Sequence, residues 1–253
     1  MTETFDIFLI AMTALALVVY VALHFFEAGY GYLFDRRYGF PVSNKLGWML
    51  MEAPVFVAMT ILWLLSDRTW QAAPLALFLM FQSHYLYRAI IFPLRLRGRS
   101  KMPFGIVAMG MLFNTLNALM QGGWIFFVSP ADYYEGWFAR PYIYIGAAIF
   151  FAGMYVNRRS DAIIRGLRKE GDTRHYIPRG GMFRYVSSAN YFGELTEWTG
   201  FAVASWSWAG AVFVWWTFAN LAPRSASLYK RYTAEFGEEF TALKRKRIIP
   251  FIY

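Results

Sequence analysis

The sequence contains no cysteine, only three histidines and few charged residues. Without cysteine the chain has no disulfide, no thiolate nucleophile and no Cys-ligated metal, and so few histidines make a metal site an unfavourable hypothesis. Charged residues make up 16% of the chain, against about a quarter in soluble domains. A helix-opening GxGxxG, a Walker loop and a Ser/His/Asp order are also missing. These absences argue against a Rossmann fold and against a triad hydrolase.

Apolar and aromatic side chains take the place of the missing charge. Hydrophobic residues make up 58% of the chain and aromatic residues 21%. Several apolar runs approach the ~20 residues that cross a hydrocarbon core of about 30 Å, and Trp and Tyr are typical of membrane interfaces. The net charge of +9 therefore indicates a membrane surface and no nucleic acid. The first run, 5–26, lacks a basic segment and a cleavage site, so we interpret it as a retained helix.

The apolar runs predict one all-α integral membrane domain over 1–253, a seven-transmembrane-helix bundle. The expected spans are 5–24, 47–65, 70–93, 104–127, 142–160, 190–206 and 207–223, with only 205–208 between the last two. The segments 158–189 and 224–253 are long enough to fold over the helix ends and cover a site there.

Basic residues are segregated between the two sides that seven spans create. Arg68 and Arg140 lie on the side of the N-terminus and Arg88 lies within a span, which leaves 22 of the 25 Lys and Arg residues for the other side. Positive residues favour the cytosolic side of a membrane. The pattern therefore predicts an N-terminus outside and a C-terminus in the cytosol.

Polar and ionisable residues recur inside the predicted spans, where they are costly and mark function. They are Glu52, His84, Tyr85, Tyr87, Arg88, Asn114, Asn117, Gln121, Asn157, Asp161, Asn190, Glu194 and Glu197. Most lie in the cytosolic half, which predicts a pocket open to the cytosol. Hydrogen bonding between helices explains the polar residues near 114–121 as well as a functional site does. Glu52 and Arg88 could also form a structural ion pair. The residues alone indicate a membrane enzyme or a ligand-binding bundle for a phosphate-bearing ligand and a lipid-like substrate.

A run of motifs in the C-terminal half resembles one known family. The motifs are NRRSD at 157–161, LRK at 167–169, YIPRGGMF at 176–183, YVSSANYFGE at 185–194, EWTGFA at 197–202 and IPFIY at 249–253. In this order and spacing they resemble the steroid 5α-reductase family (3-oxo-5α-steroid 4-dehydrogenases). The weaker N-terminal resemblance rests on residues near 29–31, 52–54, 84–88, 97–99 and 117–121.

The resemblance implies NADPH-dependent reduction of the C4–C5 double bond of a 3-oxo-Δ4-steroid. Hydride reaches C5, a proton reaches C4, and the ketone oxygen must be polarised because it gains negative charge. Glu52 and Tyr85 match the family's ketone-binding pair. Glu52 would need to be protonated, or to share a proton with Tyr85, as in other sites where a neutral carboxylic acid donates to a steroid oxygen.

The same resemblance implies the residues of the cofactor site. The matching positions are Arg97, Arg99, Asn157, Asp161, Arg168, Asn190, Glu194 and Tyr229. The arginines are expected to hold the pyrophosphate and the 2′-phosphate, and Asn190 and Glu194 to orient the nicotinamide end. Arg224 matches a further family position only across a gap.

Some positions depart from the family pattern, including Met109, an arginine in animal relatives, and the segment 225–228. They lie around the expected entrance, so the steroid need not be an animal hormone, and we favour a bacterial member. We expect a monomer in a bacterial inner membrane, or in the endoplasmic reticulum of a eukaryote, with a steroid or sterol-like lipid entering from the bilayer. The competing hypotheses are an isoprenylcysteine-type methyltransferase using S-adenosylmethionine and a non-enzymatic sterol-binding bundle.

Overall fold

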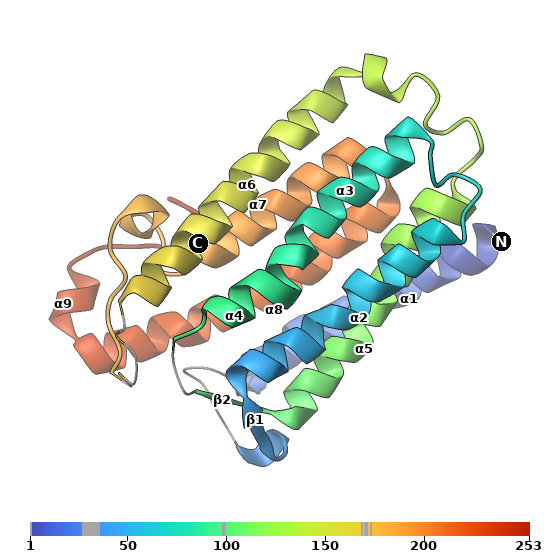
Figure 1. The fold of residues 1–253 in the computed structure, drawn as a ribbon. Coiled ribbons are helices and arrows are strands. Elements are labelled where there is room, and N and C mark those ends of the chain that lie inside the picture. Colours follow the sequence, from blue (N-terminus) through green and yellow to red (C-terminus); the bar gives the residue numbers. More distant parts are fainter. Residues whose placement is uncertain (1, 27–35, 98–99, 168, 170–171, 173) are drawn as a thin grey trace.

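Helices make up most of the described chain. The computed structural model describes residues 2–26, 36–97, 100–167, 169, 172 and 174–253 (Figure 1). The long helices are α1 (Thr2–Phe25), α2 (Asn44–Leu64), α3 (Ala72–Leu86), α5 (Phe104–Gly123), α6 (Pro141–Gly166), α7 (Ala189–Ser205) and α8 (Trp208–Phe236). The short elements are α4 (Phe92–Arg95), α9 (Glu238–Thr241), the 3₁₀ turns η2 (Arg36–Tyr38), η5 (Trp137–Ala139) and η6 (Gly181–Arg184), and the π-helical turns η3 (Tyr87–Ile91) and η4 (Trp124–Val128).

A long helix stands at each of the seven positions where the sequence predicts a span, but several helices run further than the apolar segments. The last of them, α8, continues to Phe236 through Pro223, although its apolar run ends at 223. Similarly, α6 continues to Gly166. Apolar length marks the part of a helix that suits hydrocarbon, whereas helical hydrogen bonding extends into a polar segment without difficulty.

The break between α7 and α8 falls at the short segment where the sequence predicts it. Trp206 ends α7 in a left-handed conformation with φ 50°. Ser207 then caps α8, because its Oγ accepts a hydrogen bond from the backbone N of Gly210 at 3.0 Å. A serine at this position satisfies one of the unpaired N–H groups of a new helix, so only two residues separate α8 from the end of α7.

Among the described residues, four helical stretches are long and apolar enough to cross a membrane: Thr2–Phe25, Asn44–Leu64, Ala72–Arg95 and Phe104–Val128. The chain is thus a helical membrane protein. Within the described residues the only paired strands are β1 (Pro41–Ser43) and β2 (Lys101–Pro103), which are antiparallel. They provide none of the parallel strands of a Rossmann fold, in agreement with the prediction.

The β1–β2 pair holds the starts of α2 and α5 side by side (Figure 1). Pro41 pairs with Pro103, and Asn44 at the start of α2 donates its N–H to the carbonyl of Ser100 at 3.0 Å. Two helices that begin from one strand pair run together along the bundle. The interior faces of α2 and α5 therefore meet. The buried polar residues of the two helices lie there, namely Glu52, Asn114, Asn117 and Gln121.

Four glycines bring the backbones of α6 and α7 into contact. Gly146 and Gly153 on α6 face Gly193 and Gly200 on α7, and both pairs are seven residues apart. A Cβ on any of them would lie 2.2–2.4 Å from a backbone nitrogen of the facing helix. Small residues at such an interface allow close helix packing in membranes. The polar residues of α6 and α7 are therefore held at close range.

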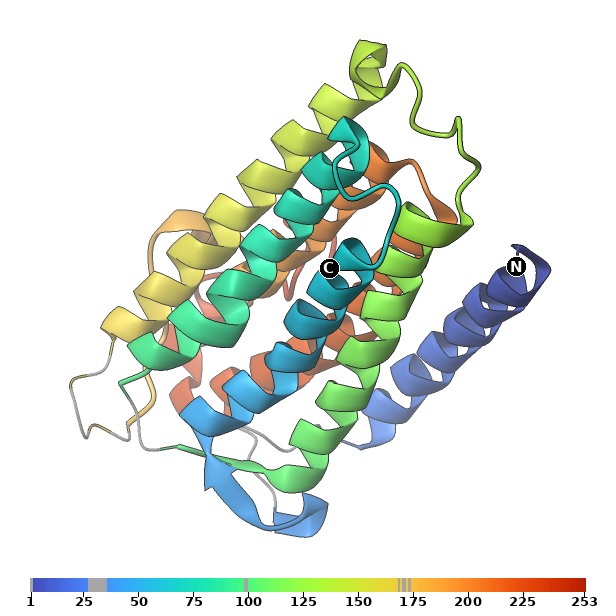
Figure 2. The ribbon, with the colours of Figure 1, turned by 45° about the vertical axis from the view of Figure 1, so that its right-hand side comes forward.

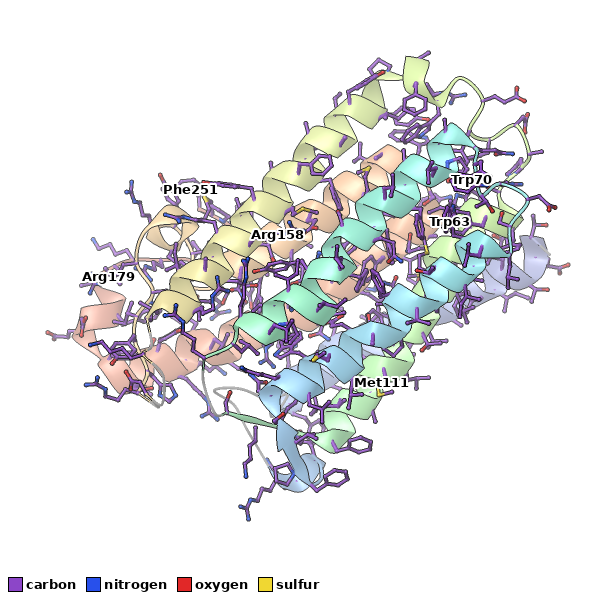
Figure 3. All side chains as sticks on the ribbon, viewed as in Figure 1. Trp63, Trp70, Met111, Arg158, Arg179 and Phe251 are labelled. Carbon is purple, nitrogen blue, oxygen red and sulfur yellow. The ribbon has the colours of Figure 1, made fainter. Side chains whose placement is uncertain are left out.

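The other helices surround this pair unevenly. α1 lies at the edge of the bundle, and the two views together place it beside α8 (Figure 2). Ile10 and Val18 of α1 are 69% and 62% exposed, as expected for side chains that face lipid. Trp63 and Trp70 lie near one end of the bundle and Arg179 lies near the other (Figure 3).

Candidate active site

Glu52 and Tyr85 lie inside the bundle on neighbouring helices. Glu52 belongs to the buried stripe of α2 and is 8% exposed, and Tyr85 of α3 is 3% exposed. The two groups interact electrostatically with each other. The rings of Phe81 and Trp198 pack beside Tyr85, with centroids 4.7 and 5.7 Å away. A carboxyl and a phenol thus share a water-poor, aromatic-lined interior.

Two asparagines of α5 complete this first cluster. Asn114 Nδ2 donates to Glu52 Oε2 at 3.1 Å and to the carbonyl O of Met51 at 2.7 Å. Asn117 Nδ2 donates to Tyr85 Oη at 3.0 Å. Gln121, one turn further along, donates to the carbonyl O of Ala209 on α8 at 2.8 Å. Gln121 therefore joins α5 to α8, whereas the two asparagines join α5 to α2 and α3 through the candidate ketone-binding pair.

A second cluster joins α6 to the start of α7. Asn157 Nδ2 donates to the carbonyl O of Asn190 at 2.9 Å and to Glu194 Oε2 at 3.5 Å. Asp161, 5% exposed, is hydrogen-bonded to the Asn190 side chain. Four residues predicted to bind the cofactor therefore come together here. They do so because the glycine contact fixes the register of α6 against α7.

The other predicted cofactor residues are placed differently. Tyr229 lies on α8 in a separate group, with the Phe240 ring 5.1 Å away and the Arg247 guanidinium 5.9 Å from its own ring. Arg97 is exposed after α4. Arg99 and Arg168 lie outside the described residues.

Arg88 connects the two clusters. Its guanidinium is 3.4 Å from Asp161 Oδ2 and lies over the Trp48 ring at 4.4 Å. It also interacts electrostatically with Glu52. Arg88 is 7% exposed, so its charge is buried between the candidate substrate and cofactor residues. Pairing with Asp161 lowers the free-energy cost of burying this charge.

A buried His–Glu pair lies beside Tyr85. His84 Nδ1 and Glu197 Oε1 are 2.9 Å apart, and the residues are 5% and 0% exposed. The sequence singled out both residues as polar positions within spans but did not pair them with each other. Predicting the pair requires knowing that α3 packs against α7, and hydrophobic periodicity does not show which helices are neighbours.

Arg158 occupies a position that sequence reasoning did not assign. In a regular helix the carbonyl of Ser83 would accept from the N–H of Tyr87, but that N–H bonds His84 O where the π-helical turn begins. Arg158 Nη2 donates to the Ser83 oxygen instead, at 2.7 Å, and points from α6 toward α3 (Figure 3). The arginine therefore satisfies a carbonyl that the π turn releases.

The second cluster carries buried polar atoms that suit a phosphate-bearing cofactor. Arg165 Nη1 and Ser188 Oγ are buried and have no hydrogen-bond partner among the described residues. Ser188 is the N-cap residue of α7, yet its side chain makes no capping hydrogen bond. Donors at a helix N-terminus and a guanidinium fork are suited to anionic oxygens. Arg224, buried on α8, lies nearby in the fold, with Nε 2.6 Å from the hydroxyl of Tyr191.

The fold and these two clusters define a helical membrane protein whose interior has a carboxyl–phenol pair beside a second, phosphate-compatible cluster. The model of the 3-oxo-5-alpha-steroid 4-dehydrogenase family matches residues 100–253. The chain is 39% identical to a steroid 5-alpha-reductase of Arabidopsis thaliana, over 92% of this chain and 90% of that one.

Mammalian relatives are equally similar. The mouse 3-oxo-5-alpha-steroid 4-dehydrogenase 1 is 38% identical over 94% of this chain and 92% of its own length. The human protein of that name is 39% identical over 84% of this chain and 81% of its own. The chain therefore belongs to the steroid 5-alpha-reductase family of oxidoreductases, as its C-terminal motifs predicted.

Proposed function

We propose that this protein reduces the C4–C5 double bond of 3-oxo-Δ4-steroids to 5α-3-oxosteroids with NADPH. The observation that carries the proposal is the buried Glu52–Tyr85 pair within one interior with the Asn157–Glu194 cluster. Family membership supports the reaction class. A methyltransferase would need neither a ketone-polarising pair nor arginines suited to phosphate.

Charge must move onto the ketone oxygen during this reaction. NADPH supplies the hydride that forms the new C–H bond at C5. The electrons of the C4–C5 double bond then form a C3–C4 enolate, and a proton at C4 gives the saturated ketone. Glu52 and Tyr85 would donate hydrogen bonds to the 3-oxo group, in an interior where such donors stabilise developing charge most. Donation requires Glu52 to hold a proton or to share one with Tyr85.

The second cluster would hold the cofactor. Asn157, Asp161, Asn190 and Glu194 are suited to the nicotinamide end because they combine amide and carboxyl groups within hydrogen-bond range. Arg97, Arg99, Arg168 and Tyr229 would contact the phosphates and the adenosine end, and we add Arg165 and Ser188 for their buried unpaired atoms.

The same proposal covers the arrangement in the membrane. α7 contacts α3, α8 contacts α1 and α5, and α6 packs against α7. The polar residues of α6 and α7 face each other, which supports seven spans in one domain. The segregation of basic residues supports an N-terminus outside and a cytosolic cofactor site. The steroid would enter a monomer from the bilayer of the inner membrane or endoplasmic reticulum.

The direct test is reduction of testosterone or progesterone by the purified protein with NADPH deuterated at C4 of the nicotinamide. We expect deuterium at C5 of the product. Glu52→Gln and Tyr85→Phe should each lower kcat by about 100- to 1,000-fold, the usual effect of removing one such donor, while NADPH still binds. Protein that binds S-adenosylmethionine, but neither NADPH nor a 3-oxo-Δ4-steroid, would overturn the proposal.

A further inference from the structure

Each member of the Glu52–Tyr85 pair accepts a hydrogen bond from its own asparagine on α5. Asn114 and Asn117 are three residues apart and therefore lie on one face of the helix. Both are buried, at 6% and 0% exposed. Thr115 lies between them but is exposed, and its Oγ1 donates to the carbonyl of Met111 in the same helix. The contact with the pair is thus a property of this face of α5.

The direction of the hydrogen bond from Asn114 is determined by the backbone. Its Nδ2 donates to the carbonyl O of Met51 at 2.7 Å and to Glu52 Oε2 at 3.1 Å. A carbonyl oxygen only accepts, so the amide group of Asn114 cannot be reversed without facing oxygen to oxygen. Glu52 Oε2 is therefore the accepting atom, and Oε1 is left to carry a proton or face a ligand.

The bond from Asn117 has a similar consequence for the phenol. Its Nδ2 lies 3.0 Å from Tyr85 Oη, so the hydroxyl oxygen accepts and its O–H proton must point elsewhere. The Asn117 Oδ1 atom is buried and has no partner among the described residues, so this amide is not engaged by other groups there. A hydrogen bond into a hydroxyl oxygen also polarises its O–H bond and strengthens the bond that the hydroxyl donates.

We propose that Asn114 and Asn117 are positioning residues that occupy the acceptor sides of Glu52 and Tyr85, so that both O–H groups are directed at the substrate ketone. This inference rests on the proposed function. The competing explanation is that the two asparagines only join helices, as polar residues in membrane bundles often do. The two explanations differ in whether the electronic state of a bound ketone depends on these amides.

The test combines kinetics with the infrared spectrum of a bound steroid. We would compare Asn114→Leu and Asn117→Leu, near-isosteric changes without donors, with Thr115→Val on the exposed face. The probe is a 3-oxo-Δ4-steroid labelled with ¹³C at C3 and bound with NADP⁺, which cannot reduce it. Tyr85→Phe calibrates the shift in C=O stretching frequency that the loss of one donor causes.

We expect each leucine variant to lower kcat by about 10- to 100-fold, as outer-shell partners usually do, with a smaller change in KM. The carbonyl stretch should move to higher frequency, in the direction of Tyr85→Phe, whereas Thr115→Val should match the unaltered protein. In a Tyr85→Phe background, Asn117→Leu should add little, because residues that act through one another are non-additive.

The inference would be overturned if the leucine variants showed an unshifted carbonyl stretch and an unchanged kcat, or if the losses of kcat in the double variant were additive. The two asparagines would then only join helices. If the unaltered protein reduces no steroid, the proposed function fails instead. Should Asn114→Leu not fold, Asn117→Leu decides alone, because it removes no hydrogen bond to the backbone.

Discussion

The two halves of the candidate site are built by different forces. On the proposed cofactor side, α6 and α7 touch through backbone atoms at Gly146, Gly153, Gly193 and Gly200. On the substrate side, α2, α3 and α5 are joined across their polar residues by side-chain hydrogen bonds, such as those from Asn114 and Asn117. Two helices whose backbones touch cannot move closer or rotate without a clash. Side chains that join helices by hydrogen bonds can instead change rotamer.

The difference indicates which half can vary. A change of side chain between α2 and α5 alters one polar contact, and neighbouring side chains can adjust to a new substrate. A change between α6 and α7 moves two helices, and every residue of the cofactor cluster moves with them. We therefore expect changes in steroid preference to arise from substitutions on the substrate side, and we expect the cofactor side to tolerate few substitutions.

The largest effect is expected from Gly153→Leu, which tests the backbone contact. A Cβ at Gly153 would lie 2.2 Å from the backbone N of Glu197, so the helices must separate. Overpacking a core usually costs about 1–3 kcal/mol, and a clash with backbone should exceed that range. Thermal unfolding in detergent should show a large loss of stability together with lost NADPH binding.

Gly166→Ala is the matched control on the same helix, because a Cβ there meets nothing within 4 Å. It should unfold at the temperature of the unaltered protein. Equal stability of Gly153→Leu and Gly166→Ala would mean that the glycine contact does not hold the cofactor side together.

Arg165→Met should have a smaller and more local effect. The unpaired Nη1 of Arg165 would lose its hydrogen bond to a cofactor oxygen, and such bonds to charged groups are worth about 1.5–3 kcal/mol. The Kd of NADPH, measured by equilibrium dialysis, should rise by about 10- to 100-fold. Arg159→Met, at an exposed position of α6, should leave it unchanged. An unaltered Kd in Arg165→Met would remove Arg165 from the cofactor site.

The smallest effect is expected at the His84–Glu197 bond, one of the bonds between the two halves. His84→Phe removes the partner of the fully buried Glu197 carboxyl, and an unsatisfied buried polar group costs about 1–3 kcal/mol. Chemical denaturation should report this loss, and a second change, Glu197→Leu, should recover most of it. If the double variant is less stable than His84→Phe, the pair is not coupled in this way.

Much of the candidate site was accessible from residue order. The positions of Glu52, Tyr85, Asn157 and Asn190 followed from polar residues inside apolar runs and from motif spacing. Their partners were not accessible in the same way. The pairing of His84 with Glu197 and of Arg158 with the Ser83 carbonyl depends on helix neighbours and on a π-helical turn, neither of which leaves a periodic signal.

The sequence by itself determined the number and order of the long helices, the family and most of the polar positions that matter. These follow from local properties, because apolar length and motif spacing are read along one chain. The tertiary structure decided which polar groups meet, and hence the directions of the hydrogen bonds from Asn114 and Asn117 to the Glu52–Tyr85 pair. Those directions depend on how α5 lies against α2 and α3, and the β1–β2 pair at the starts of α2 and α5 forms only in the folded chain.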